Sequence, residues 1–475
     1  MRPQVAAQVE ERLFEAAQEA SRRAARLDRP VLLSWVRRVE EESHLFRFLR
    51  QGAARGVPAF YYSTPGRGLR IAGTGLAASV RPRGAGRFQG AAIEWKKLTG
   101  GRLVVAPGGE PPLAAPVALG GFAFFDRPAR EEWGAWRPFG EGLLAVPDEC
   151  RIEYEGAFWS VRTALVPPHA DPESVLAALS GPARRKAPGP EEEEPTAEEA
   201  ARGDRRPGDD PDHYRRIVAS AADAIRRGAF VKVVLARECF VPGEFSPWDV
   251  VERLDGAHPG AYVFSFHLEG RAFVGATPER LLSLRGGEIA AMALAGSAPR
   301  GETPEEDEAI GEALLASEKN QGEHRVVVDY LVEALSSVCA RIEAASRPSL
   351  LRTPNVQHLY TPVRGELAAG TSLLELLGRV HPTPAVGGYP KEEALAYLRA
   401  REGIERGWYA GPVGWIDARG EGEFAVALRS ALLLPGGASI YAGCGIVASS
   451  DPDEELEEAR LKARAMLHAL GRSVS

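Results

Sequence analysis

The chain has few cysteines and no long run of apolar residues. None of its 475 residues lies in a run of the ~18 uninterrupted apolar residues that mark a membrane-spanning helix, so the sequence predicts no membrane span. The cysteines show no CxxC spacing, which argues against both a disulfide framework and a zinc site. A reducing cytoplasm is therefore the expected compartment. The four are Cys150, Cys239, Cys339 and Cys444.

An excess of positive charge is also lacking. Lys and Arg number 58 against 65 Asp and Glu, which gives a net charge of −7. A nucleic-acid-binding surface needs a basic patch, so we expect no nucleic-acid partner. The N-terminus has a charged amphipathic helical pattern, and no apolar run follows its basic residues as in a signal sequence. Apolar residues make up 44% of the chain, which predicts a substantial core.

One break in composition divides the chain. Residues 181–211 are dominated by charge and proline and keep no apolar periodicity, which predicts a flexible surface loop. The loop separates a strand-rich N-terminal part, residues 1–180, from a C-terminal part, residues 212–475. Runs of strand patterns with helical patterns clustered between them predict an α+β fold with large antiparallel sheets.

Two helices of the C-terminal part have recognisable starts. Asp212 is the expected N-cap of a helix over residues 213–227, which Gly228 would close. The sequence Thr303-Pro304-Glu305-Glu306 is a capping box with proline at the first helical position. It predicts helical structure to about residue 345, with a break near Gly322.

The last helix carries the most informative pattern. Ser449, Ser450 or Asp451 can cap it. At ~100° per residue, Glu455, Glu458 and Lys462 then fall within one arc of its surface. Paired carboxylates suit a hard cation such as Mg²⁺. The same pattern also fits a solvated, ion-paired helix face, so the helix alone leaves both interpretations open.

Two further ionisable residues lie in apolar sequence. Lys232 belongs to an expected strand over residues 229–240, where it either reaches an edge or stays desolvated as a neutral base. Glu279 follows a strand and precedes Leu281 and Leu282. Such apolar neighbours favour a carboxyl group that keeps its proton and acts as an acid. The alternative is a surface ion pair between Glu279 and Arg280.

Other candidates need partners from elsewhere in the chain. Glu323 precedes an apolar run and can complete a carboxylate set with Glu455 and Glu458 if the two helices approach each other. Arg429 lies in an expected strand with apolar residues on both sides, a setting in which a guanidinium requires an anion. Ala295-Gly296-Ser297 is a turn of small residues that lets backbone amides approach a ligand.

Taken in order, these segments resemble the chorismate-utilising enzymes, namely the isochorismate, anthranilate, salicylate and aminodeoxychorismate synthases. The resemblance covers nearly all of the C-terminal half, whereas the N-terminal half matches only loosely, through GGFAFFD (120–126). It implies one large α+β sandwich that buries a Mg²⁺-dependent site. The matching segments include KVVLAR (232–237), FVGATPERLL (273–282), SEKNQGEH (317–324), FAVALRSA (424–431) and YAGCGIVASSDPDEELEEARLK (441–462).

Within this family the chain is most similar to isochorismate synthases. Lys232 stands where the ammonia-using anthranilate synthases carry glutamine, and Ala295 stands where aminodeoxychorismate synthases carry lysine. The Leu-Leu-Glu-Ser signature of tryptophan-regulated relatives is missing, and so is a glutaminase module. The resemblance therefore implies an isomerase that converts chorismate to isochorismate without a glutaminase subunit.

The resemblance also implies a role for each residue. Mg²⁺ would be held by Glu323 and Glu458, with Glu455 nearby. Lys232 would activate water, and protonated Glu279 would donate a proton to the departing hydroxyl. The remaining residues would bind chorismate: Arg429 and Tyr409 on the enolpyruvyl carboxylate beside the Gly443 backbone, Lys462 as a further positive charge, and Leu294, Ala295, Gly296 and Ala385 as the wall.

Several alternatives stay open. Salicylate synthases have a similar lysine and acid but also eliminate pyruvate. A non-catalytic chorismate-binding subunit is a second alternative, which a matched acid and base argue against. We expect the isochorismate to feed menaquinone synthesis, while siderophore or salicylate synthesis remains an alternative. The resemblance further implies a monomer.

Overall fold

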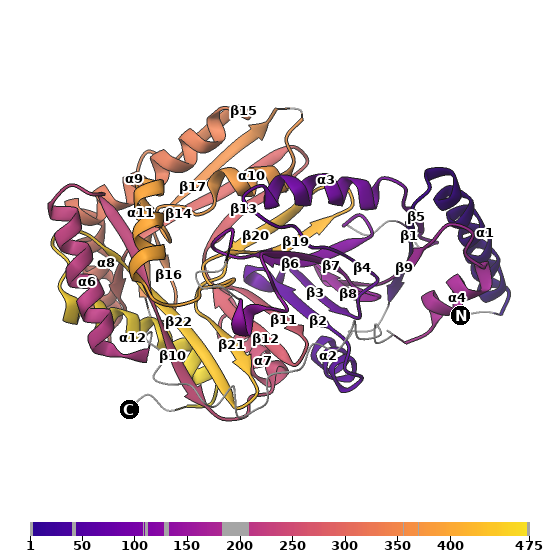
Figure 1. The fold of residues 1–475 in the computed structure, drawn as a ribbon, viewed down its shortest axis with the longest axis horizontal. Helices are drawn as coiled ribbons and strands as arrows, with labels where there is room; N and C mark the ends of the chain where they lie inside the picture. Colours follow the sequence, from indigo (N-terminus) through magenta and orange to yellow (C-terminus); the bar gives the residue numbers. More distant parts are fainter. Residues whose placement is uncertain are drawn as a thin grey trace.

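The computed structural model describes residues 3–39, 44–107, 109, 113–127, 133–182, 209–354, 356–368 and 370–472. Two large sheets pack face to face, with helices on their outer faces and at both ends (Figure 1). All strand pairs of the described residues are antiparallel except β1 with β5. The predicted α+β class with large antiparallel sheets is confirmed.

The first sheet has 12 strands and crosses the whole molecule. Strand β11 of the C-terminal part pairs with β2 of the N-terminal part, so the sheet is continuous across the predicted boundary. Its strands, in spatial order, are β18 (Gly388–Tyr389), β10 (Lys232–Pro242), β22 (Gly437–Ile446), β21 (Ser430–Leu434), β12 (Arg271–Thr277), β11 (Tyr262–Leu268), β2 (Ala59–Ser63), β3 (Leu69–Thr74), β8 (Glu149–Tyr154), β9 (Ala157–Val166), β1 (Val31–Val39) and β5 (Leu103–Val105).

The second sheet has 10 strands and is built in the same way. Strand β19 of the C-terminal part pairs with β6 of the N-terminal part. The division into parts at residues 181–211 stays a prediction. The strands, in spatial order, are β15 (Cys339–Ala344), β17 (Val356–Leu367), β14 (Glu288–Pro299), β13 (Arg280–Arg285), β20 (Gly422–Val426), β19 (Pro412–Asp417), β6 (Val117–Phe122), β7 (Gly142–Val146) and β4 (Ala78–Val80), with β16 (Ser349–Arg352) beside β17.

The helices cover both ends of this sandwich (Figure 1). Helices α1 and α4 lie at one end, and α6, α11 and α12 at the other. Their bounds are α1 (Pro3–Leu27), α2 (Leu45–Ala54), α3 (Arg87–Thr99), α4 (Pro172–Ser180), α6 (Pro211–Arg226), α7 (Pro247–Ala257), α8 (Pro304–Ala316), α9 (Glu318–Ser336), α10 (Leu373–Val380), α11 (Lys391–Arg401) and α12 (Pro452–Ala469).

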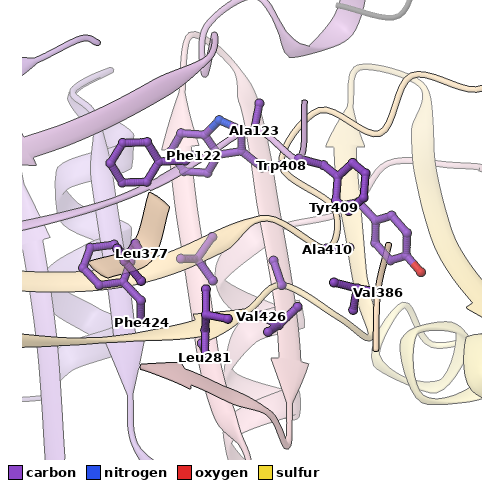
Figure 2. Close-up of a cluster of buried hydrophobic side chains, with 14 of the residues drawn as sticks. Phe122, Ala123, Leu281, Leu377, Val386, Trp408, Tyr409, Ala410, Phe424 and Val426 are labelled. Atoms are coloured by element: carbon purple, nitrogen blue, oxygen red, sulfur yellow. The ribbon is translucent and has the colours of Figure 1, made fainter. Parts of the chain in front are cut away.

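The main core fills the space between the two sheets. Figure 2 shows its aromatic centre, where Phe122 of β6 lies 6.3 Å from Phe424 of β20 between ring centroids. Burying one such side chain stabilises the fold by roughly 1.5–3 kcal/mol. The same cluster continues to Val386, Tyr409 and Ala410, which line a cavity described below. The core therefore holds one wall of that cavity rigid.

Three predictions of helix ends need correction. Helix α6 begins at Pro211 and is capped by Asp210, not Asp212, because proline suits the first helical position and the Asp210 carboxylate accepts from the Asp212 amide at 2.9 Å. The helical sequence breaks at Ser317, not Gly322, because the Ser317 hydroxyl caps α9. It ends at Ser336 rather than near residue 345, since residues 339–344 form β15.

The capping box at Thr303 is only half formed. The Thr303 hydroxyl accepts from the Glu306 amide at 3.2 Å, as predicted. The Glu306 carboxylate, however, accepts from the Glu302 amide at 2.9 Å instead of the Thr303 amide. The C-terminal helix begins as predicted, with Pro452 first and the Asp451 carboxylate accepting from the amides of Asp453 and Glu454.

The sequence predicted that Arg429 lies within one strand, and this prediction is wrong. Strand β20 ends at Val426 in one sheet, and β21 begins at Ser430 in the other. Arg429 occupies the crossover with φ +49°, a left-handed conformation that ends regular strand structure.

Two expectations about chain segments remain to be placed. Most of the predicted charged loop, residues 183–208, lies outside the described residues. Within the described part of the chain, no helix combines the length and apolar character that crossing a membrane requires.

Candidate active site

A cavity of about 290 Å³ lies where β10, β14, β22, α9 and α12 meet. These elements are far apart in the sequence and are brought together by the two sheets. The cavity lining contains every residue predicted for the site: Lys232, Glu279, Leu294, Ala295, Gly296, Glu323, Ala385, Tyr409, Arg429, Gly443, Glu455, Glu458 and Lys462.

Lys232 lies at the start of β10 and is buried, with only 4% of its surface exposed. It therefore does not reach an edge of the sheet. Its Nζ donates to Glu323 Oε1 of α9 at 2.6 Å. Gly445 leaves room for this pair, because a Cβ there would lie 2.8 Å from Lys232 Cε and 3.3 Å from Glu323 Oε1. The contact with Glu323 holds the Lys232 amine inside the cavity.

Glu279 lies in the turn between β12 and β13 and is 4% exposed. Burial raises its pKa to about 8, and the charges of Lys232 and Arg429 limit the rise. The alternative of a surface pair with Arg280 is wrong, because Arg280 binds Glu423 at 3.2 Å and the Tyr262 hydroxyl at 2.9 Å. Glu279 therefore holds its proton at neutral pH.

Arg429 provides a cation that the protein does not neutralise directly. Its carbonyl accepts from the Ala276 amide at 3.2 Å, which fixes the strained backbone. Burial lowers the pKa of Arg429, and Tyr409 and Glu458 oppose this shift. Among the described residues no carboxylate forms an ion pair with Arg429. Its guanidinium is placed for an anionic ligand.

Tyr409 and Gly443 form an adjoining part of the wall. The Tyr409 ring stacks on Tyr441 with centroids 5.2 Å apart. A Cβ at Gly443 would lie 3.1 Å from the Tyr409 hydroxyl and 2.8 Å from the Leu235 carbonyl, so glycine is needed here. Burial raises the pKa of Tyr409 to about 12, which keeps its hydroxyl a hydrogen-bond donor.

Helix α12 contributes two carboxylates and an amine. Lys462 Nζ pairs with Glu458 Oε1 at 2.6 Å and donates to the Gly443 carbonyl at 3.0 Å. Burial would lower the pKa of Lys462, but Cys444 and Glu458 raise it to about 12. Glu455 Oε1 accepts from the Ser450 hydroxyl at 2.7 Å. The helix therefore presents a fixed positive charge beside two carboxylates.

The carboxylates fit a hard cation. Ligand atoms of Cys444, Glu455 and Glu458 lie within 4.8 Å of one another. Burial raises the pKa of the Cys444 thiol to about 12, so the thiol stays protonated and leaves two oxygen donors, which suit Mg²⁺ better than a soft metal. Burial would raise the pKa of Glu323, yet Lys232 lowers it, so this third carboxylate is ionised. Joint binding of a metal by Glu323 and Glu458 stays a prediction.

The sequence did not single out two polar residues of the cavity. His358 of β17 is buried, its Nδ1 lies 2.8 Å from the Ser297 hydroxyl, and burial lowers its pKa to about 3. Arg406 pairs with Glu402 at 2.6 Å and donates to the Val234 carbonyl at 2.6 Å. His358 lies on β17 and reaches the cavity through strand pairing, whereas Arg406 lies in the segment between α11 and β19 and is held by these two contacts.

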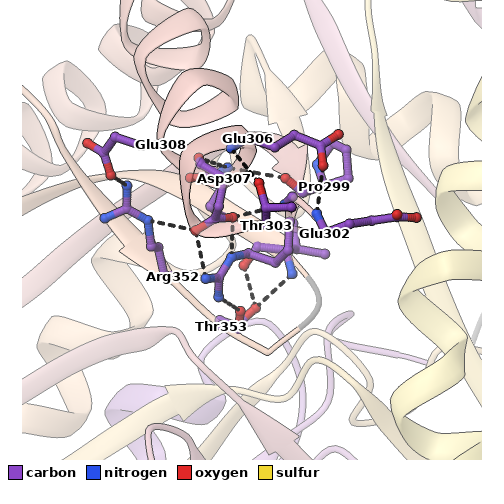
Figure 3. A network of polar contacts seen from close by, with 12 residues as sticks. Pro299, Glu302, Thr303, Glu306, Asp307, Glu308, Arg352 and Thr353 are labelled. Carbon is purple, nitrogen blue, oxygen red and sulfur yellow. Dashed lines mark hydrogen bonds and ion pairs between the residues drawn. The ribbon is translucent and has the colours of Figure 1, made fainter.

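Hydrogen bonds hold α9 beside the cavity, and a separate network holds the start of α8, which precedes it. His324 is buried beside Glu323, with Nε2 2.7 Å from the Thr361 hydroxyl and Nδ1 3.3 Å from the Ala295 carbonyl. Figure 3 shows the network at the start of α8, where Asp307 accepts from Arg300 at 2.6 and 2.7 Å. The contacts of His324 fix α9, the helix that presents Glu323.

Comparison with known proteins identifies the family. Residues 15–471 match the family described as chorismate binding enzyme. The chain is 38% identical to the salicylate biosynthesis isochorismate synthase of Pseudomonas aeruginosa, over 94% of this chain and 92% of that protein. It is 36% identical to the isochorismate synthase MenF of Bacillus subtilis, over 95% of this chain and 96% of that protein.

A solved structure shares the fold. The menaquinone-specific isochorismate synthase MenF of Escherichia coli superposes with a TM-score of 0.74 at 23% identity, covering 96% of this chain and 99% of that one. The chain thus belongs to the chorismate-binding enzymes.

Proposed function

We propose that this member of the chorismate-binding enzymes is an isochorismate synthase. One observation carries the proposal: a buried carboxyl group with a raised pKa, Glu279, and a buried amine, Lys232, line the same cavity. Exchange of one hydroxyl for another across a ring requires an acid and a base acting at separate positions. Two relatives that match over most of this chain are named isochorismate synthases.

We propose that Glu323, Glu455 and Glu458 hold Mg²⁺. When bound, the ion would contact the ring carboxylate of chorismate and withdraw electron density from the ring. The ionised state of Glu323 and the protonated thiol of Cys444 support this donor set.

In the proposed reaction, Lys232 takes a proton from a water molecule as the water oxygen bonds to the ring carbon beside the carboxylate-bearing carbon. The ring double bond shifts, and the bond to the original hydroxyl breaks. Glu279 gives its proton to that hydroxyl, which leaves as water. One water enters and one leaves, so the product is an isomer of the substrate, and proton exchange with solvent restores both residues.

The other residues of the cavity position chorismate in this proposal. Arg429 and Tyr409 bind the enolpyruvyl carboxylate, because this guanidinium has no carboxylate partner among the described residues and the hydroxyl is a donor. Lys462, beside the Gly443 carbonyl, supplies a further positive charge. The remaining wall is shaped by Leu294 and by the small residues Ala295, Gly296 and Ala385.

We further propose that the product feeds menaquinone synthesis and that the enzyme works as a monomer without a glutaminase. The match to a MenF over 96% of that protein supports the pathway. The match to a salicylate-pathway enzyme is the reason to test it. Deleting the gene should abolish menaquinone and leave catecholate siderophores and salicylate unchanged.

The decisive test is the product formed from chorismate and Mg²⁺ by the purified protein. We expect isochorismate without salicylate or pyruvate. Equal amounts of salicylate and pyruvate would identify a salicylate synthase instead. Tight chorismate binding without any product would identify a non-catalytic subunit. An assay with added ammonium should yield no amino product, because Lys232 stands where ammonia-using relatives carry glutamine.

A further inference from the structure

A strip of arginines crosses the outer face of the 12-stranded sheet in the N-terminal half. In the register of β1, β9 and β8, Arg37 lies opposite Ser160, which lies opposite Arg151. Arg162 lies opposite Glu149 in the same way. Residues directly opposite each other in a sheet point to the same face. We call these five residues the arginine cluster.

The arginine cluster lies between two groups of helices on this face. Helices α1 and α4 cover the strands on one side, and Arg162 donates to the Leu179 carbonyl at the end of α4 at 3.3 Å. Helix α2 covers the strands on the other side, and its Phe48 ring lies 5.3 Å from the Arg151 guanidinium.

The arginine cluster contains more positive than negative charge. Both oxygens of Glu149 are occupied, one by Arg151 at 2.8 Å and the other by Arg162 at 2.7 Å. Arg37 has no ion pair with any described residue, and its guanidinium lies 4.3 Å from the Trp35 ring. Burial and the neighbouring Arg162 and Arg151 lower the pKa of Arg37. Three guanidinium groups thus share one carboxylate.

The next carboxylate along β8 does not relieve this excess. Glu153 points to the same face as Arg151 but accepts from Arg70 at 3.0 Å. Arg70 also pairs with Asp255 at 3.2 Å, so these carboxylates belong to a separate network.

Two buried hydrogen-bonding groups in or beside the arginine cluster have no partner among the described residues. The Ser160 side chain is 1% exposed, and its Oγ has no hydrogen-bond partner among the described residues. The same holds for the Nε1 of Trp35, two residues before Arg37 on the same face of β1. A buried donor without an acceptor lowers stability, and it gains most from an anionic acceptor.

We propose that the arginine cluster binds a small oxyanion, a ligand with a phosphate or a carboxylate group. The anion bridges Arg37 and Arg151 and accepts the hydroxyl hydrogen of Ser160. Guanidinium groups match the oxygen spacing of both chemical classes. The site is distinct from the catalytic cavity, whose lining contains none of the five residues. The proposal therefore stands apart from the isochorismate synthase assignment.

The test measures anion binding to the full-length protein at constant ionic strength. Inorganic phosphate and succinate are titrated against sodium chloride, by calorimetry and by the shift in melting temperature. A ligand that binds only the folded state raises the melting temperature with saturation. We expect saturable binding of phosphate, succinate or both, and the arm that binds identifies the chemical class.

Variants locate the site. Arg37→Gln and Ser160→Ala should each weaken binding by about tenfold or more, since each loses a charge-assisted hydrogen bond. Arg38→Gln is the matched control, because Arg38 is the next residue of β1, faces the other side and lies 6.0 Å from the Trp159 ring. It should keep wild-type affinity. Chorismate turnover without added anion confirms that each variant is folded.

Two results would overturn the proposal. One is equal anion affinity in the wild type and Arg37→Gln with both proteins folded. The other is the absence of saturable binding by both phosphate and succinate. Because Ser160→Ala removes only a hydroxyl, it keeps the test valid even if Arg37→Gln unfolds.

Discussion

The two sides of the catalytic cavity carry the same kind of ion pair in different settings. On the β10 side, Lys232 meets Glu323 at 2.6 Å, and the two residues come from separate elements. On the α12 side, Lys462 meets Glu458 at 2.6 Å within one helix, and Lys462 also binds the Gly443 carbonyl. Lys462 is thus a fixed cation with two acceptors. Lys232, which lies on a strand, has one carboxylate partner, which comes from α9.

This difference suggests a division of labour. Lys232 has one carboxylate partner among the described residues, so its amine becomes available to a water molecule when Glu323 binds another group. A lysine whose pKa is raised to about 12 stays charged throughout and can only attract anions. We therefore propose proton transfer on the β10 side and charge compensation on the α12 side.

The largest expected effect comes from Lys232→Ala. It should lower kcat for isochorismate formation by roughly 10²- to 10⁴-fold, because the general base is lost. Lys319→Ala, at the cavity rim, serves as the control and should keep most of the activity. Steady-state kinetics and circular dichroism make the measurement. Near-normal kcat in folded Lys232→Ala would remove the distinction between the two lysines.

The second prediction concerns the acid that faces Lys232. Glu279 must be protonated to act, and its folded-state pKa is about 8, so activity should be present below this pH and fall as the pH rises through it. Glu279→Gln should lower kcat by roughly 10²-fold or more and abolish this alkaline limb. The pH profile of kcat is the measurement. An unchanged limb in Glu279→Gln would place the acid elsewhere.

The third prediction sharpens the role of the carboxylates. Glu323→Gln and Glu458→Gln should each raise the Mg²⁺ concentration for half-maximal activity by more than about tenfold, because loss of a ligand costs at least as much affinity as loss of an outer-shell partner, about 10- to 100-fold. Calorimetric titration with Mg²⁺ alone checks binding without turnover. Overlapping Mg²⁺ titrations for Glu458→Gln and the wild type would contradict the assignment.

The smallest expected effect is that of Cys444→Ala. The protonated thiol packs as a small apolar group and donates to the Glu455 carbonyl at 3.3 Å, so Mg²⁺ affinity and kcat should stay within about twofold of wild type. The same Mg²⁺ titration measures this. A large loss of Mg²⁺ affinity would make the sulfur a metal ligand.

Much of the catalytic cavity could be predicted because its residues stand out locally. Lys232 and Glu279 are charged residues in apolar sequence, and Glu455, Glu458 and Lys462 follow helical spacing behind a cap. Their convergence could not be read from spacing, because it depends on which strands pair. Only the family resemblance supplied it.

The features that were missed depend on long-range contacts. His358 reaches the cavity through the pairing of β17 with β14, and Arg406 is held there by the distant Val234 carbonyl. Arg429 looked like a strand residue because the sequence does not show that the chain changes sheets there. The arginine cluster likewise arises from the register of β1, β9 and β8. These strands belong to the N-terminal half, which matches the chorismate-utilising enzymes only loosely.

Isotope labelling tests the central claim most directly. Chorismate is incubated with the enzyme and Mg²⁺ in H₂¹⁸O, and the products are analysed by mass spectrometry at low conversion. If Lys232 and Glu279 act as proposed, one water adds to the ring and the original hydroxyl leaves, so each isochorismate molecule should carry one ¹⁸O atom. Isochorismate without label would show that the original hydroxyl migrates within the ring, and it would contradict this account.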